Sequence, residues 1–115
     1  MPTIPSDFIN YKTSPVFTKD NVPKMLLHHH NTKEGVFGEI IVIQGTLKFF
    51  GFNGRHGEIE SEFDIDSKAP AVSPPQYWHK VELMTEDTSF KINFYAQKDS
   101  EIVLKNLSER DDKIV

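Results

Sequence analysis

Histidines are the residues of this sequence whose type and spacing point most directly to chemistry. Three are consecutive, His28, His29 and His30, and two stand apart, His56 in a glycine-rich turn and His79 farther along the chain. The chain has no cysteine. Thiolate metal sites, disulfides and a cysteine nucleophile are therefore excluded, and histidines and carboxylates remain as the metal ligands available.

The spacing of the histidines predicts a metal site. The segment Lys24–His30 has the length of a strand, and a strand would direct His28 and His30 to one face and His29 to the other. Two imidazoles so placed can share one metal ion, and a neighbouring strand carrying His79 could supply a third nitrogen. The predicted metal ligands are therefore His28, His30 and His79.

Ordinary structural roles for these histidines compete with the metal hypothesis. Three adjacent histidines can form a polar edge, and Trp78 followed by His79 can be a core aromatic residue beside a hydrogen-bonded histidine. His56 lies in the turn Asn53–Gly57, where we expect solvent exposure.

Composition and charge limit the classes of function. The chain has 115 residues, with 13 Lys and Arg against 17 Asp and Glu, which gives a net charge of −4 and predicts one small domain. Nucleic acid and anionic membrane surfaces are poor partners, because no basic block is present. The N-terminus lacks the pattern of a signal peptide, and no apolar run reaches the ~20 residues that span a bilayer. We therefore expect a cytoplasmic protein.

Short strands separated by turns dominate the pattern. The proline-rich first 23 residues predict an extended arm that pairs at a sheet edge, and the charged tail from Lys98 predicts fraying or a short helix. No segment of ten residues has a helical apolar repeat, so seven or eight strands in an antiparallel sandwich or barrel are expected. The segments predicted as strands are 24–30, 37–43, 46–52, 59–65, a short extended piece within 70–75, 78–84 and 89–95.

The segments 37–43 and 46–52 also predict a hairpin closed by Gln44 and Gly45. In that register one face carries only apolar residues, while Lys48 and Thr46 share the other. The residues predicted for the core are Ile40, Val42, Leu47 and Phe49. Glu39 falls on the outer face, and Glu82 falls opposite His79 on its strand, so neither carboxylate is a good fourth ligand.

Five segments in order along residues 11–97 carry a resemblance to a known family. The sequence resembles the tellurite-resistance protein B and YeaR-like domain in 15–23 (PVFTKDNVP), 30–33 (HNTK), 35–38 (GVFG), 45–49 (GTLKF) and 75–82 (PQYWHKVE). The resemblance implies a cupin-like antiparallel β-barrel over residues 1–115, made of an arm at 1–23, a barrel at 24–97 and a tail at 98–115.

The resemblance also implies where a metal would bind. Cupins hold metal inside the barrel on a His-x-His strand and a later strand, which correspond here to His28, His30 and His79. The family often has a carboxylate where this chain has His28, and the cupin glutamate falls at Gly38 and is missing. A neutral, nitrogen-rich site of this kind suits zinc first, with nickel or copper as alternatives.

Three classes of function follow from these observations. The first is a small metal-binding cupin that serves resistance to tellurite or another toxic oxyanion. The second is a non-catalytic module that binds an apolar small molecule, with Phe49, Phe63, Trp78 and Phe94 as candidate walls. The third is an assembly role in which the arm crosses to a second copy in a homodimer. Some family members fuse this domain to a methyltransferase, but this chain has no S-adenosylmethionine-binding motif, and no catalytic residue is assigned.

Overall fold

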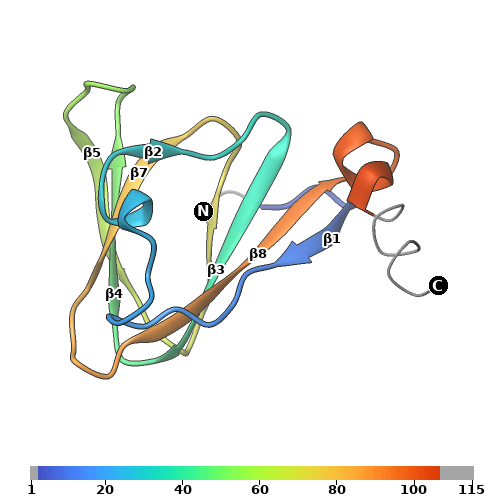
Figure 1. Cartoon of the computed structure of the whole chain (residues 1–115). Coiled ribbons are helices and arrows are strands. Elements are labelled where there is room, and N and C mark those ends of the chain that lie inside the picture. The colour runs from blue at the N-terminus through green and yellow to red at the C-terminus, as the bar shows by residue number, and fades with distance from the viewer. Residues whose placement is uncertain (1–2, 107–115) are drawn as a thin grey trace.

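The computed structural model describes residues 3–106 and consists almost entirely of two four-stranded antiparallel sheets (Figure 1). One sheet has the order β1-β8-β3-β6 and the other the order β2-β7-β4-β5. The elements are β1 (Phe8–Thr13), the 3-10 helix η1 (Lys24–Leu27), β2 (His30–Asn31), β3 (Val36–Gln44), β4 (Leu47–Phe52), β5 (Ile59–Ile65), β6 (Ala71–Ser73), β7 (Trp78–Leu83) and β8 (Ser89–Gln97). Residues 101–106 are helical. The all-β class and the number of strands are confirmed.

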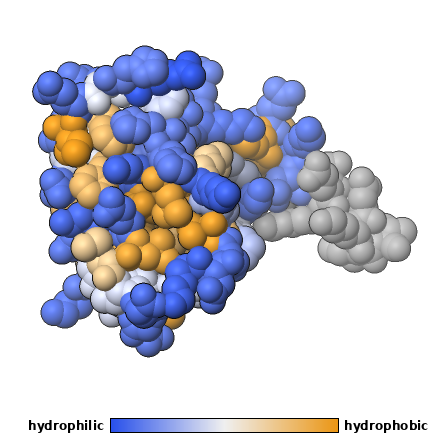
Figure 2. Space-filling view, turned by 60° about the vertical axis from the view of Figure 1, so that its left-hand side comes forward, coloured by the Kyte–Doolittle hydropathy of each residue, from blue (hydrophilic) through white to orange (hydrophobic). Residues whose placement is uncertain are grey.

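The core lies between the two sheets and follows the alternation of apolar residues along the strands. In β3 the buried residues alternate with half-buried ones from Val36 to Val42, which is the period of two that a strand with one buried face requires. The four residues predicted for the core are all buried, at 0 to 3% exposure. Hydrophobic side chains also gather at the centre of one outer face, within a border of hydrophilic residues (Figure 2).

The predicted hairpin between 37–43 and 46–52 is wrong. β3 pairs with β6 and β8, whereas β4 pairs with β5 and β7, so the chain crosses from one sheet to the other at Gly45. The buried hydroxyl of Thr88 accepts a hydrogen bond from the Thr46 amide (3.3 Å) and donates one to the Thr46 carbonyl (3.0 Å). These two bonds pair the backbone amide and carbonyl of Thr46 at the corner where the chain crosses between the sheets. The corner therefore does not need the hydrogen bonds of a hairpin turn.

The predicted strand over 24–30 is also wrong, because most of it is the 3-10 helix η1. The carbonyl of Pro23 accepts a hydrogen bond from the Leu26 amide (3.0 Å), and the carbonyl of Met25 accepts one from the His28 amide (3.3 Å). This single turn buries Leu26 in the core and leaves Met25 64% exposed. Because the turn buries Leu26, it is favoured over an extended strand in this short apolar segment.

The remaining elements follow the prediction closely. The arm forms β1, which pairs with the outer side of β8, and Phe17 makes a further bridge to Phe90. β5, β6 and β7 lie where strands were expected, and β8 extends two residues beyond its predicted end. Within residues 3–106 no helix is long and apolar enough to cross a membrane.

Candidate functional site

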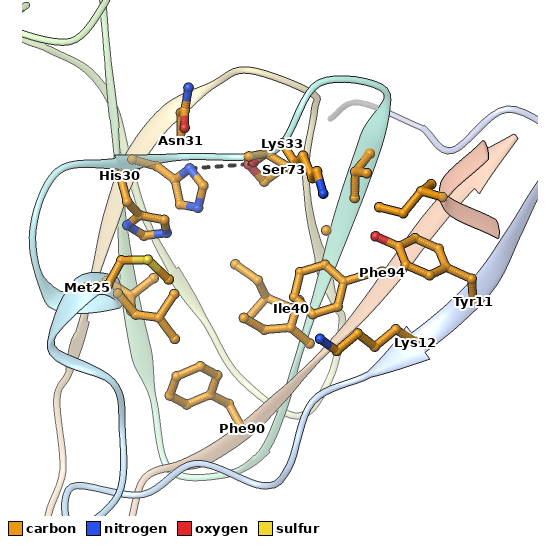
Figure 3. A pocket seen from close by; sticks show the side chains of 18 of the residues that line it. Tyr11, Lys12, Met25, His30, Asn31, Lys33, Ile40, Ser73, Phe90 and Phe94 are labelled. Carbon is orange, nitrogen blue, oxygen red and sulfur yellow. Dashed lines mark hydrogen bonds between the residues drawn. The ribbon is translucent and has the colours of Figure 1, made fainter. Parts of the chain in front are cut away.

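A cavity of about 460 Å³ lies between the sheets and opens to solvent (Figure 3). Its walls are mostly apolar, and one side carries a polar group made of His30, Thr32, Ser73 and His79. Lys12, Lys33 and Lys105 also line it. The apolar part of the lining includes Leu26, Ile40, Val81, Phe90, Ile92 and Phe94. A concave apolar site with a few convergent polar groups is typical of small-molecule binding.

The pairing of β2 with β7 brings two of the predicted ligands together. His30 lies directly opposite His79 in the register of these strands, and the centroids of the two imidazole rings are 4.1 Å apart. His79 is 6% exposed, and His30 is half-buried. Two residues 49 positions apart in the sequence thus form one side-chain pair in the cavity wall.

Backbone carbonyls fix the same ring nitrogen of both histidines. Nδ1 of His30 lies 2.9 Å from the carbonyl oxygen of His28, and Nδ1 of His79 lies 2.8 Å from that of Tyr77. A carbonyl oxygen can only accept, so the proton of each neutral ring is assigned to Nδ1, which donates it. Nε2 of each ring then carries a free lone pair, which is the arrangement seen in metal-ligating histidines.

Burial keeps both imidazoles neutral at pH 7. The pKa of His79 is lowered to about 4 by burial and by the nearby charge of protonated His30, against the opposing effect of the hydrogen bond to the Tyr77 carbonyl. The pKa of His30 is lowered by burial, against the hydrogen bond to the His28 carbonyl. A neutral imidazole is the form that binds a metal ion or accepts a proton.

Two buried hydroxyls support the position of His79. Thr32 and Ser73 are hydrogen-bonded through their hydroxyls (2.8 Å), and the Ser73 hydroxyl lies 3.4 Å from Nδ1 of His79. The amide of Gln76 also donates to the carbonyl of Thr32 (2.8 Å), which ties the loop before β7 to the end of β2. The His79 ring therefore contacts Ser73 and the Tyr77 carbonyl directly, and Thr32 holds Ser73 in place.

The other histidines lie elsewhere. His28 follows η1, is exposed and does not line the cavity. It contributes to the site only through its backbone carbonyl, which accepts a hydrogen bond from Nδ1 of His30. His29 stacks on Phe52 with ring centroids 3.8 Å apart. His56 is exposed, as predicted, and with His29 and Trp78 lines a second pocket, which shares Met25, His30 and Asn31 with the cavity.

Glu39 and Glu82, the two carboxylates that the sequence did not favour as metal ligands, do not line the cavity. Glu39 is on the outer face of its sheet, where it accepts hydrogen bonds from the Tyr95 hydroxyl (3.2 Å) and the Asn93 amide (3.3 Å). Glu82 is exposed and lies 3.8 Å from Nζ of Lys80. Both carboxylates thus lie on the strand faces that the alternation predicts, away from the described cavity lining.

The donor set fits a metal ion held by two protein nitrogens. Among residues 3–106 no group of three or more His, Cys, Asp or Glu side chains is placed to hold a metal ion, so the three-histidine arrangement is not formed. The two Nε2 lone pairs suit zinc, nickel or copper, and the remaining positions would be left to water or an added ligand. Ligation by His30 and His79 stays a prediction.

Sequence reasoning missed several members of this site. Thr32, Ser73 and the three lysines were not singled out, since isolated hydroxyls and charges carry no pattern that distinguishes a cavity from a surface. Of the four aromatic residues suggested as walls, only Phe94 lines the cavity. Phe49 is in the core and stacks on Phe63 (4.9 Å between centroids), because both face each other across β4 and β5.

Comparison with known proteins identifies the family. The model of the TehB-like domain matches residues 12–92. This chain belongs to the TehB-like domain family. The protein named YeaR from Escherichia coli (strain K12) is 30% identical over 111 residues, a match that covers 93% of this chain and 92% of YeaR. The resemblance inferred from the five sequence segments is confirmed.

The TehB-like domain is also found as part of a longer protein. The Haemophilus influenzae (strain Rd) protein named Probable S-adenosyl-L-methionine-dependent methyltransferase TehB is 40% identical over 96 residues. The match covers 82% of this chain but only 33% of that protein, so the chain spans about a third of its length. The named methyltransferase activity is that of the longer protein.

Solved structures show the same fold. A crystal structure of a protein from Escherichia coli (strain K12) has a TM-score of 0.80 and 32% identity and covers 84% of this chain and 97% of that one. The crystal structure of TehB from Haemophilus influenzae has a TM-score of 0.76 and 36% identity and covers 82% of this chain and 33% of that one.

Proposed function

We propose that this TehB-like domain binds a divalent transition metal ion, zinc first, through Nε2 of His30 and Nε2 of His79. One observation carries the proposal: both rings line the cavity and use Nδ1 to donate to a backbone carbonyl, which leaves Nε2 of each ring with a free lone pair. The depressed pKa values keep these lone pairs unprotonated at pH 7.

The residues around the pair hold it ready for binding. Ser73 and the Tyr77 carbonyl orient His79, while the His28 carbonyl orients His30. A bound ion with only two protein ligands acts as a Lewis acid with open positions for an anion. Family membership supports the view that this binding serves resistance to tellurite or another toxic oxyanion.

The expected result of a metal titration separates the two cavity histidines from the others. Calorimetric titration of untagged protein with Zn²⁺ at pH 7 should show about one ion per chain, and His30→Ala or His79→Ala should each weaken binding by about 100-fold, since one of two ligands is lost. His28→Ala should leave the affinity unchanged, because that substitution keeps the backbone carbonyl on which His30 depends.

Two controls make this titration decisive. His56→Ala removes an exposed histidine outside the cavity and should also bind zinc normally. Thermal unfolding of each variant in chelator shows whether the fold is retained. Equal zinc affinity in the wild type, His30→Ala and His79→Ala would refute the proposed metal site, as would a larger loss in His28→Ala than in His30→Ala.

A second candidate function is the binding of a small organic molecule in the cavity. The cavity volume of about 460 Å³ lies within the range of ligand pockets, and apolar side chains such as Ile40, Phe90 and Phe94 form much of its wall. This function does not require the metal ion, and the two can be tested separately by working with and without a chelator.

A further inference from the structure

Among residues 3–106, the charged side chains that line the cavity are all of one sign. Lys12, Lys33 and Lys105 line it, and no aspartate or glutamate of this part of the chain does. The chain as a whole has the opposite bias, with 17 acidic against 13 basic side chains. The electrostatic potential at the cavity therefore favours anions although the protein carries a net negative charge.

The cavity lysines also lack ion-pair partners among residues 3–106. Three other lysines in this part of the chain are paired, namely Lys19 with Glu86, Lys48 with Glu62 (3.4 Å) and Lys80 with Glu82 (3.8 Å). No carboxylate lies within ion-pair distance of Lys12, Lys33 or Lys105 in the described residues. Their ammonium groups are therefore available to a ligand, and Figure 3 shows Lys12 and Lys33 among the side chains around the cavity.

The volume and walls of the cavity decide between an inorganic and an organic anion. An oxyanion of a few atoms would fill only a small part of about 460 Å³ and would leave apolar walls in contact with water. An organic anion would bury its apolar body against Ile40, Phe90 and Phe94 while its charged group reaches the lysines.

We infer that the cavity binds a small organic anion, a carboxylate or sulfonate on an apolar body, with Lys12, Lys33 and Lys105 selecting its charge. The inference rests on the proposed small-molecule function and names the class of its ligand. It does not require the metal ion, because the lysines and the apolar walls are other residues of the cavity lining than His30 and His79.

The test compares three probes of similar shape and different charge. Binding of 4-phenylbutyrate, 4-phenylbutanol and 4-phenylbutylamine is measured by calorimetry and ligand-observed NMR on chelator-treated protein at pH 7. We expect the acid to bind about tenfold more tightly than the alcohol and the amine to bind most weakly, with the preference reduced at high salt.

Charge-matched variants assign the preference to the cavity lysines. The triple variant Lys12→Gln, Lys33→Gln, Lys105→Gln should bind the acid and the alcohol equally. The control Lys68→Gln, Lys91→Gln, Lys98→Gln changes the net charge by the same amount at residues outside the cavity and should keep the preference.

Each other outcome overturns a defined part of the account. Equal binding of acid and alcohol by the wild type would refute the inference about charge and leave the small-molecule function standing. Binding of none of the three probes would refute both. A preference for the acid that survives in the cavity variant would refute the role of the three lysines.

Discussion

Lowering the pH from 7 to 4 is expected to reduce the free energy of unfolding of the metal-free protein by about 3 kcal/mol through His79 alone. The pKa of this imidazole falls from its ordinary value of 6.5 in the unfolded chain to about 4 in the folded protein. Between these two values the unfolded state binds the extra proton and the folded state does not. Stability is therefore complete above pH 6.5 and is lost as the pH falls toward 4.

Urea denaturation at pH 7, 5.5 and 4, in the presence of a chelator, measures this effect. Carboxylates also contribute to acid destabilisation, so the comparison of variants is what isolates the histidine. His79→Gln should lose about 3 kcal/mol of the pH dependence, while His56→Gln, at an exposed position, should keep all of it. An unchanged pH dependence in His79→Gln would mean that the buried ring does not stay neutral.

Replacing Gly45 with alanine is expected to destabilise the fold by about 2 to 5 kcal/mol. The backbone at Gly45 has φ of +76°, and an added Cβ would lie 2.5 Å from the Thr85 hydroxyl oxygen and 2.8 Å from the Cα atom of Thr88. The clash with backbone cannot be relieved by a change of rotamer. Thr88 also holds Thr46 at this corner, so a shift there would disturb the crossing between the sheets.

Gly35 provides a matched control for this substitution. Its φ of +75° is nearly the same, but an added Cβ would meet nothing within 4 Å. Gly35→Ala should therefore show only the backbone cost of about 1 to 2 kcal/mol. Equal midpoints of urea denaturation for Gly35→Ala and Gly45→Ala would contradict the proposed crowding at the corner.

Local patterns were sufficient to predict most of the strands and the core. The alternation along β3 and the aromatic run in β4 place Ile40 and Phe49 in the interior, and this depends only on neighbours two residues away. Glu39 was placed on the outer face from the register of the predicted hairpin. The hairpin is wrong, but the alternation within β3 gives Glu39 the same outward face.

The errors arose where distant residues determine the local conformation. The pattern at Gln44 and Gly45 predicted a hairpin, but the hydrogen bonds of Thr88 to Thr46 take the chain across to the other sheet. At 24–28 the turn has a local hydrogen bond, from the Leu26 amide to the Pro23 carbonyl, but its distant cause is the core in which Leu26 is buried. This turn leaves His28 outside the cavity wall.

The candidate site was predictable in part. The sequence drew attention to His30 and His79 by residue type and by the family resemblance, and the structure places them opposite each other. Strand β2 has only two residues, too few to carry a recognisable alternation. The sequence could not show that His28 takes part through its backbone carbonyl, which accepts from His30, and not through its imidazole, because every residue has a carbonyl.

Long-range ¹⁵N–¹H NMR of the histidine rings, recorded at pH 7 before and after addition of Zn²⁺, tests the central claim most directly. The structure predicts that His30 and His79 carry their proton on Nδ1, and that zinc shifts the Nε2 resonances of these two rings while those of His28, His29 and His56 stay in place. A proton on Nε2 of either cavity ring, or zinc-induced shifts confined to the three other histidines, would contradict the account.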